Sequence, residues 1–113
     1  MDTKLVLIEN IKEFIRNAKK SKEEKSYNSS VTLYFKAISV ITDLFIYLKE
    51  GFIPSNHSNR FRILETKYPE LYNILDKSFP VYQQSYSLKM GIEQVEELEN
   101  DTKRILEITK IDI

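Results

Sequence analysis

The stretch VTLYFKAISVITDLFIYLKEGF, residues 31–52, decides the fold that this sequence predicts. Its apolar residues recur at spacings of three and four on two adjacent faces, which is the period of an α-helix. Only a narrow line of polar residues is left for solvent: Thr32, Lys36, Ser39, Asp43 and Glu50. A helix that is apolar around most of its circumference is either buried or covered by a second chain. We therefore expect this stretch to form the central helix of a bundle.

The composition of the chain also favours helices. Its 113 residues are 42% hydrophobic and include only 2 glycines and 3 prolines. Sheets and hairpins need such turn residues at short intervals, whereas long runs without them suit helices. The length suits one domain. We therefore predict one all-α domain over residues 1–113, folded as an antiparallel, up-and-down bundle of four to five helices.

Capping residues predict where the first two helices start. Asp2 or Thr3 begins the first helix, because either side chain accepts hydrogen bonds from the free amides of a first turn. The lysine-rich stretch 17–30 is interpreted as a solvated helix end followed by a connection. A cap for the central helix is expected among the last polar residues of that stretch: Asn28, Ser29 or Ser30.

Glycine and proline predict the boundaries that follow. Gly51 ends the central helix. Ser55 or Asn56 caps a short helix, Pro69 separates it from a second short helix, and Pro80 breaks or kinks the chain. The last helix is predicted to run from residue 81 or 82 to residue 109, with its acidic side chains exposed to solvent.

The charge and the rare residue types exclude several classes of site. The 17 basic and 17 acidic side chains cancel, so the chain lacks the basic excess typical of nucleic-acid binders. It has no cysteine and 1 histidine, which excludes the usual zinc sites and the Glu-x-x-His pairs of di-metal bundles. Two isolated glycines cannot build a phosphate-binding loop. We predict no metal site and no cofactor.

The sequence gives no membrane signal. The first residues, MDTKLVLIENIKEF, lack the basic start, the uninterrupted apolar core and the cleavage site of a signal peptide. The apolar stretch carries Lys36, Asp43, Lys49 and Glu50, and each charge near the centre of a bilayer costs about 2.5–3.5 kcal/mol. We expect a soluble, cytoplasmic protein that does not bind a membrane.

One polar cluster is a candidate site. Asn56, His57, Arg60 and Arg62 follow a proline at the predicted start of a short helix. Helix N-termini attract anions through their free amides, and two arginines reinforce that attraction. The cluster is therefore a candidate contact for an anion or a nucleic acid, and His57 is a candidate acid or base for phosphodiester chemistry. In the alternative interpretation, His57 caps the helix and the arginines pair with acidic neighbours.

The tyrosines suggest a surface for self-association. The chain has 7 tyrosines and no tryptophan, and two of the tyrosines fall on one face of the predicted last helix. Exposed tyrosines can stack on bases, whereas tyrosines at a core edge or a dimer seam keep their hydroxyls in water. We predict a homodimer seam that combines these two tyrosines with residues of the central helix: Tyr34, Ile41, Phe45, Tyr82 and Tyr86.

The order of the predicted elements resembles a known superfamily. An amphipathic helix and a lysine-rich connection precede the long apolar helix, which opens with SYNSSVTLYFKAISVITDLFIYL at residues 26–48. A Gly/Pro break, Ser-Asn-His at residues 55–57, two short helices and an acidic helix (GIEQVEELENDTKRIL, residues 91–106) complete the order. This pattern resembles the HEPN superfamily of small helical bundles.

The resemblance implies an up-and-down bundle that pairs into homodimers. Many HEPN proteins are ribonucleases of toxin–antitoxin or CRISPR-type defence systems, whereas others are non-catalytic binding modules or partners of minimal nucleotidyltransferases. The nuclease members carry an arginine followed, four to six residues later, by a histidine. His57 has no such arginine before it, and no histidine follows Arg60, Arg62 or Arg104. The catalytic pair of the family therefore has no counterpart in this chain.

The expected function is non-catalytic binding or regulation as a homodimer, with a further protein as a candidate partner. Two alternatives stay open. One is an RNA-cleaving enzyme with a degenerate site at His57, Arg60 and Arg62. The other is binding of a nucleotide or a nucleic acid without catalysis.

Overall fold

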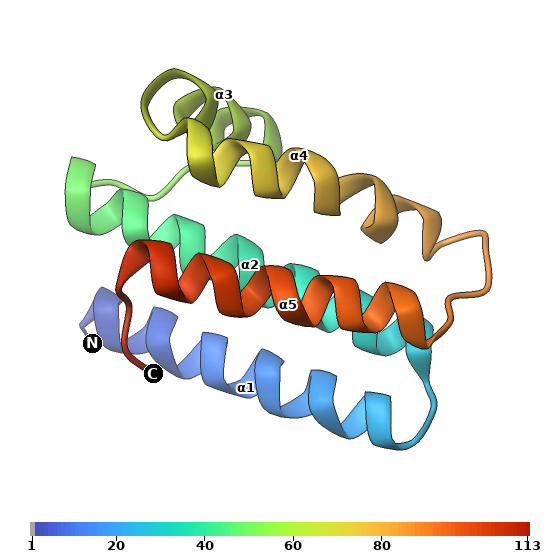
Figure 1. Cartoon of the computed structure of the whole chain (residues 1–113). Helices are drawn as coiled ribbons and strands as arrows, with labels where there is room; N and C mark the ends of the chain where they lie inside the picture. The colour runs from blue at the N-terminus through green and yellow to red at the C-terminus, as the bar shows by residue number, and fades with distance from the viewer. Residues whose placement is uncertain (1) are drawn as a thin grey trace.

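Five α-helices make up the part of the chain that the structure describes (Figure 1). The computed structural model describes residues 2–113, and in this range the chain forms no β-strand. The helices are α1 (Thr3–Glu23), α2 (Tyr27–Glu50), α3 (His57–Lys67), α4 (Pro69–Gln84) and α5 (Ile92–Thr109). The predicted all-α helical bundle is confirmed.

The stretch that decides the fold forms the central helix, α2. It packs antiparallel to α1 and also against α4 and α5, whereas α3 packs on α4. Half of its 24 residues are buried, and they lie around most of its circumference. Within the described residues, α2 alone is long and apolar enough to cross a membrane, but 61% of its apolar window is buried inside the protein. Buried core helices of soluble proteins have the same length and composition.

The core has two parts arranged along α2. One part surrounds Ile41 and Leu44 and receives side chains from all four other helices. The other part surrounds Val31 and Phe35 and includes Met90 from the connection before α5. Complete burial of an apolar side chain of this size contributes about 1.5–3 kcal/mol. The apolar circumference of α2 therefore supplies a large share of the stability of the bundle.

The first helix begins where its capping residue predicts. The Asp2 carboxylate accepts hydrogen bonds from the amides of Lys4 (2.8 Å) and Leu5 (3.4 Å). These bonds satisfy amide donors that a first turn leaves free. The predicted start of the first helix is confirmed.

The connection between α1 and α2 is shorter than the sequence predicts. Lysine is a good helix former and needs no burial, so α1 continues through the lysine-rich stretch and only residues 24–26 lie between the helices. Lys25 takes a left-handed conformation there, with a φ of 61°. α2 begins at Tyr27. The prediction that Asn28, Ser29 or Ser30 caps it is wrong.

Asn28 instead holds the connection between α4 and α5. Its side-chain amide donates to the carbonyls of Ser85 and Leu88, both at 2.8 Å, and its side-chain oxygen accepts from the amide of Met90 at 3.0 Å. Residues 85–91 have no helix of their own to pair these backbone groups. One side chain on α2 therefore satisfies three of them.

We expect the substitution Asn28→Ala to loosen residues 85–91. Each lost hydrogen bond contributes about 0.5–1.5 kcal/mol net, and water replaces part of the loss, so the free energy of unfolding should fall by about 1–3 kcal/mol. Hydrogen exchange at the amide of Met90 should become faster. Ser29→Ala, a change at the exposed neighbouring residue, should leave both measurements unchanged. Unaltered exchange at Met90 in Asn28→Ala would show that other contacts hold the connection.

Glycine, asparagine and proline set the boundaries around α3 as predicted. Gly51 ends α2 in a left-handed conformation with a φ of 87°, which a residue without Cβ adopts at little cost. The Asn56 side chain caps α3 by accepting from the amide of Asn59 at 2.9 Å. Pro69 is the first residue of α4, where a missing amide donor costs nothing.

The end of α4 and the start of α5 differ from the prediction. Pro80 lies inside α4 and does not end it. The carbonyl that loses its donor belongs to Asp76, which is exposed, so water can bond to it. The predicted last helix, residues 81–109, is correct at its end and wrong at its start, because α5 begins at Ile92.

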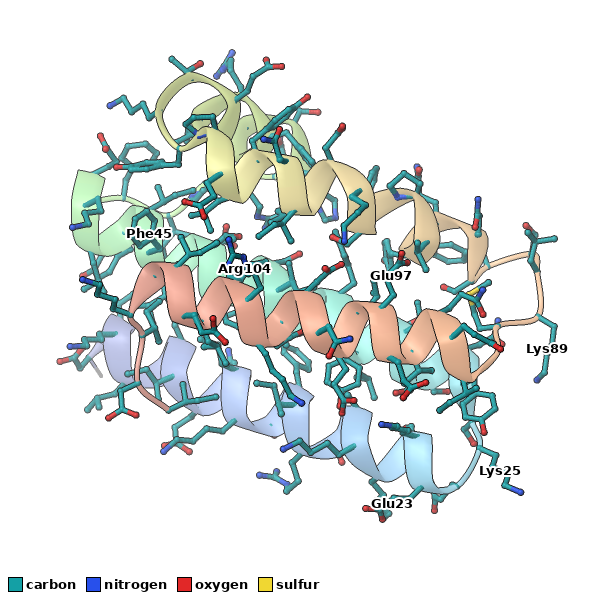
Figure 2. All side chains as sticks on the ribbon, in the orientation of Figure 1. Glu23, Lys25, Phe45, Lys89, Glu97 and Arg104 are labelled. Carbon is teal, nitrogen blue, oxygen red and sulfur yellow. The ribbon has the colours of Figure 1, made fainter. Side chains whose placement is uncertain are left out.

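The two ends of the bundle differ in character. The α1–α2 and α4–α5 connections lie at one end, where Lys25 and Lys89 project outward (Figure 2). At the other end α1 begins, α2 terminates and the C-terminus lies (Figure 1). We call this second end the apolar end, because five large hydrophobic residues near it are exposed: Leu5, Leu48, Phe52, Ile53 and Ile113.

Candidate functional site

The centre of the candidate site is a buried ion pair between α2 and α3. Arg60 donates from Nε to Asp43 Oδ1 at 2.7 Å and from Nη2 to Asp43 Oδ2 at 2.8 Å. The two residues are only 8% and 9% exposed. The prediction that Asp43 faces solvent is therefore wrong, because a charged arginine from α3 covers it. A carboxylate and a guanidinium in this two-bond geometry hold each other in one fixed orientation.

Arg60 also fixes the orientation of His57. Arg60 Nη1 lies 2.7 Å from His57 Nδ1. Because a guanidinium can only donate, Nδ1 is the acceptor and the ring proton is on Nε2. The imidazole packs beside Phe35 and Phe79, with ring centroids 6.1 and 5.5 Å away. Partial desolvation of this exposed residue by the groups packed beside its ring, followed by the charge of Arg60, lowers the pKa of His57 below its ordinary value. The ring is therefore neutral at pH 7.

These groups form one wall of a cleft of about 240 Å³. Residues from α1, α2, α3 and α4 meet there because α2 has a side that α5 does not cover. We call it the His57 cleft, and its lining residues are Phe14, Phe35, Lys36, Ser39, Val40, Asp43, His57, Arg60 and Tyr82. The cleft combines fixed polar groups with aromatic walls, and this combination characterises binding sites.

The four residues of the predicted polar cluster divide among three places. His57 and Arg60 lie together in the His57 cleft. Asn56 is used as the cap of α3. Arg62 is exposed and lines a different cavity, between α3 and α4, with Phe61 and Tyr72 among its neighbours. The interpretation in which an arginine pairs with an acidic residue is confirmed for Arg60.

Several residues of the cleft are not predicted from the sequence to belong to a site. Lys36, Ser39 and Asp43 were assigned to the solvent-facing line of the central helix, whereas Phe35 and Tyr82 belong to its aromatic wall. The available signal was their spacing, since three polar residues at intervals of three and four mark one face of an otherwise apolar helix. Their partners come from three other helices, which no local pattern connects to them.

The residues of the predicted dimer seam do not lie together on one surface of the folded chain. Tyr34 and Ile41 are 1% and 0% exposed, so they pack inside the chain and cannot meet a second copy. The Tyr34 hydroxyl donates to Glu99 at 2.7 Å, which uses its polar tip within the bundle. This part of the predicted seam is wrong, because the surplus apolar surface of α2 is covered by α1 and α5.

The other three seam residues lie in two places, because Tyr82 and Tyr86 are neighbours and Phe45 lies apart from them. Phe45 is half-buried near the apolar end and packs edge-on against Tyr68, with centroids 5.0 Å apart. Tyr82 stacks on Phe35 in the His57 cleft at 4.6 Å. Tyr86 follows α4 and is 79% exposed, with its hydroxyl 3.2 Å from that of Tyr82. They therefore do not form one continuous seam on the chain.

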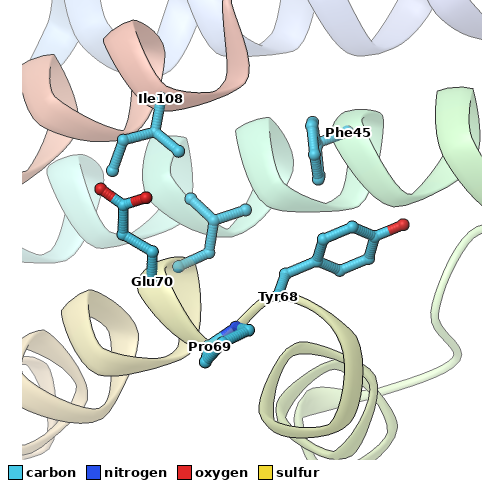
Figure 3. Close-up of a pocket in the computed structure, with 6 residues that line it drawn as sticks. Phe45, Tyr68, Pro69, Glu70 and Ile108 are labelled. Carbon is cyan, nitrogen blue, oxygen red and sulfur yellow. The ribbon is translucent and has the colours of Figure 1, made fainter.

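A second cavity, of about 270 Å³, lies near the end of α2 (Figure 3). Its walls come from α2, α5 and the junction of α3 and α4: Phe45, Tyr68, Pro69, Glu70, Leu71 and Ile108. The Tyr68 hydroxyl points away from it (Figure 3) and donates to Glu50 at 2.6 Å. With Glu70 as the one charged lining residue, the cavity suits an apolar group and offers little to orient a ligand. The His57 cleft is the better candidate site.

Neither metal ligands among the described residues nor similarity to known proteins indicates what these cavities bind. Within residues 2–113, no group of three or more histidine, cysteine, aspartate or glutamate side chains is placed to hold a metal ion. No family model matches the chain, and no curated protein or solved structure matches it either. The geometry of the cleft and the exposed surface are therefore the features that bear on function.

The lowered pKa of His57 predicts that the protein loses stability in mild acid. In the unfolded chain the imidazole titrates near 6.5. Because its pKa is lower in the folded protein, the unfolded state binds the proton first as the pH falls. The free energy of unfolding should therefore decrease as the pH drops through 6.5 towards the folded-state pKa. Urea midpoints at pH 7.5 and 5.5 measure this decrease.

The substitution His57→Gln provides the matched control for this titration. Glutamine can still accept a hydrogen bond from Arg60 but does not titrate, so the difference between the two midpoints should shrink. His57 is the only histidine in the chain. Equal differences in wild type and variant would assign the acid sensitivity to carboxylates instead.

Proposed function

We propose that this protein is a non-catalytic, HEPN-like binding module that acts in the cytoplasm as a homodimer and takes its ligand in the His57 cleft. The observation that carries the proposal is that the guanidinium of Arg60 is already bonded to other residues of the protein. Its Nε and Nη2 groups donate to Asp43, and its Nη1 group donates to His57. The cleft is thus built from polar groups that are rigidly held, as a binding wall requires.

The bonds of Arg60 to Asp43 and His57 also argue against phosphodiester cleavage. Catalysis of that reaction needs a cation aimed at the charge that develops in the transition state. The charge of Arg60 is balanced by Asp43 at bonding distance, so it is not free for this task. The order of residues agrees, since His57 precedes Arg60 in the chain whereas the histidine follows the arginine in HEPN nucleases.

The apolar end supports the homodimer. Leu5, Leu48, Phe52 and Ile53 are 58%, 49%, 47% and 42% exposed. Leu5 lies near the start of α1 and Leu48 near the end of α2, whereas Phe52 and Ile53 directly follow α2. The start of α1 and the end of α2 lie at the same end of the bundle (Figure 1). Exposed apolar residues that gather in one region mark surfaces for protein association. We therefore place the second copy there and not on the predicted tyrosine seam.

Light scattering over a range of protein concentrations tests the homodimer. The expected mass is that of two chains, and Leu48→Glu combined with Phe52→Glu should reduce it to one. Leu88→Glu is the matched control, because Leu88 is 56% exposed but lies in the connection at the opposite end. A single-chain mass for the wild type at all concentrations would overturn the homodimer.

RNA cleavage is the second candidate function. It is favoured by one observation, the presence of the chain's single histidine beside Arg60, Lys36 and Ser39 in one cleft. Incubation of RNA with wild type, His57→Ala and Arg62→Ala separates the two functions. No cleavage above a protein-free control is expected. Cleavage that disappears in His57→Ala and persists in Arg62→Ala would replace the binding function with a ribonuclease.

The resemblance to HEPN proteins also supplies two classes of protein partner. One is a minimal nucleotidyltransferase, and the other is the second component of a toxin–antitoxin type system. Either would meet the same apolar end if it replaced the second copy of the chain. Mixing the candidate partner with the homodimer and measuring the mass of the product tests this exchange.

A further inference from the structure

The charges around the His57 cleft leave one positive charge without a partner. Asp43 and Arg60 balance each other, and the imidazole of His57 is neutral. Lys36 is exposed and forms no ion pair with any residue in the described range 2–113. The lining residues contribute no other charge. A cleft with a net charge of about +1 favours a ligand that carries one negative charge.

Two further polar groups in the cleft have unused hydrogen-bonding capacity. Ser39 is 8% exposed, and its hydroxyl has no partner among the described residues. A buried hydroxyl without a partner is unfavourable, and rotation of the Ser39 side chain towards the cleft would let a ligand acceptor relieve that cost. His57 uses Nδ1 to accept from Arg60, so its Nε2–H group remains available as a donor. Together with the Lys36 ammonium, the cleft therefore offers three donor groups to an anion.

The remaining walls are apolar and largely aromatic. Phe35 and Tyr82 are stacked with an interplanar angle of 15°, and Phe14 and Val40 complete the lining. Flat rings pack well against such walls. The volume of about 240 Å³ lies below the range of roughly 300–1,000 Å³ for drug-sized ligands. The cleft therefore suits one small ring system.

We infer that the His57 cleft binds a small aromatic carboxylate, with the carboxylate at Lys36, Ser39 and His57 and the ring against the aromatic wall. This inference deepens the proposed binding function and rests on it. A carboxylate matches the single free charge, whereas a phosphate monoester brings about two negative charges. A nucleic-acid strand would require a row of cations to neutralise successive phosphates, and Lys36 is alone.

The test uses 2-naphthoate as the probe and the ring of His57 as the reporter. His57 is the only histidine in the chain, so its imidazole signals in a ¹H–¹³C spectrum are unambiguous. We expect these signals to shift and saturate with 2-naphthoate. The uncharged analogue 2-naphthylmethanol should cause no saturable shift at the same concentrations, because it lacks the carboxylate.

Three variants locate the contacts. Lys36→Gln should weaken binding about tenfold, and Ser39→Ala should weaken it about fivefold. Arg62→Gln, at an exposed residue outside the cleft, should leave the dissociation constant unchanged. Lys36 is exposed and Ser39→Ala removes one unpaired oxygen, so both variants are expected to fold. Equal affinity of wild type and Lys36→Gln would overturn the inference.

Two nucleotide probes separate failure of the inference from failure of the proposed function. Tighter binding of uridine 5′-monophosphate or of a short single-stranded oligouridylate than of 2-naphthoate would overturn the aromatic carboxylate and retain a binding cleft. No shift with any of these probes would overturn the inference, and the homodimer measurement would then decide independently whether the proposed module survives.

Discussion

The substitution Arg60→Met is expected to lower the free energy of unfolding by about 3–5 kcal/mol. It leaves the Asp43 carboxylate buried, at 9% exposure, without its cation. Removal of one member of a buried ion pair has a cost of this size, because the remaining charge is desolvated and uncompensated. Chemical denaturation at pH 7 measures the loss.

Arg104→Met is the matched control for this prediction. Arg104 pairs with Glu70 at 3.3 Å, but both side chains are about 60% exposed. Exposed pairs contribute about 0–1 kcal/mol, so the same change of residue type should have little effect there. The double variant Asp43→Leu/Arg60→Met should recover most of the lost stability, because apolar residues can replace a buried pair. A loss below about 1 kcal/mol in Arg60→Met would show that the pair is solvated.

The substitution Leu44→Ala is expected to be nearly as damaging, at about 2–5 kcal/mol. Leu44 is 0% exposed in the part of the core that receives side chains from all five helices. Its truncation removes apolar contacts and leaves a cavity that the surrounding helices cannot close fully. Thermal and urea unfolding, monitored by the helical circular dichroism signal, measure the effect.

Leu48 provides an internal comparison for Leu44. It lies one turn further along α2 and is 49% exposed, so Leu48→Ala removes the same atoms from a surface position. The loss should stay within about 0.5 kcal/mol. Similar losses in both variants would mean that Leu48 is covered, as it is if the homodimer forms through the apolar end at the concentration used. Measurement at two protein concentrations separates these cases.

The helices were predictable from the sequence where local chemistry determines them. The apolar period of residues 31–52 is strong enough to identify α2, and Gly51, Asn56 and Pro69 act through their own backbone or side-chain preferences. The prediction that Pro80 breaks the chain is wrong, because the effect of a proline depends on its exposure. A proline inside a helix is tolerated where water can reach the carbonyl that it leaves unpaired. That condition comes from the folded structure and not from the sequence.

The candidate site was only half predictable, because residues that meet in it are far apart in the sequence. His57 and Arg60 lie within one turn and stood out together. Asp43 lies 17 residues before Arg60. The local sequence pattern predicts that Asp43 faces solvent, because it does not show that α3 covers this residue. Asn28 is similar, since its partners lie 57 to 62 residues later. The partners of Asp43 and Asn28 therefore lie too far along the chain for a local sequence pattern to identify them.

The position of α2 between α1 and α5 has a consequence for synthesis of the protein on the ribosome. α1 is available as soon as α2 emerges, so one side of α2 can be covered at once. The side that packs on α5 stays uncovered until about 60 further residues have been made, which takes roughly 3–12 s at ~5–20 residues per second. During that interval the most apolar segment of the chain is exposed to chaperones, to other nascent chains and to the machinery that selects membrane segments.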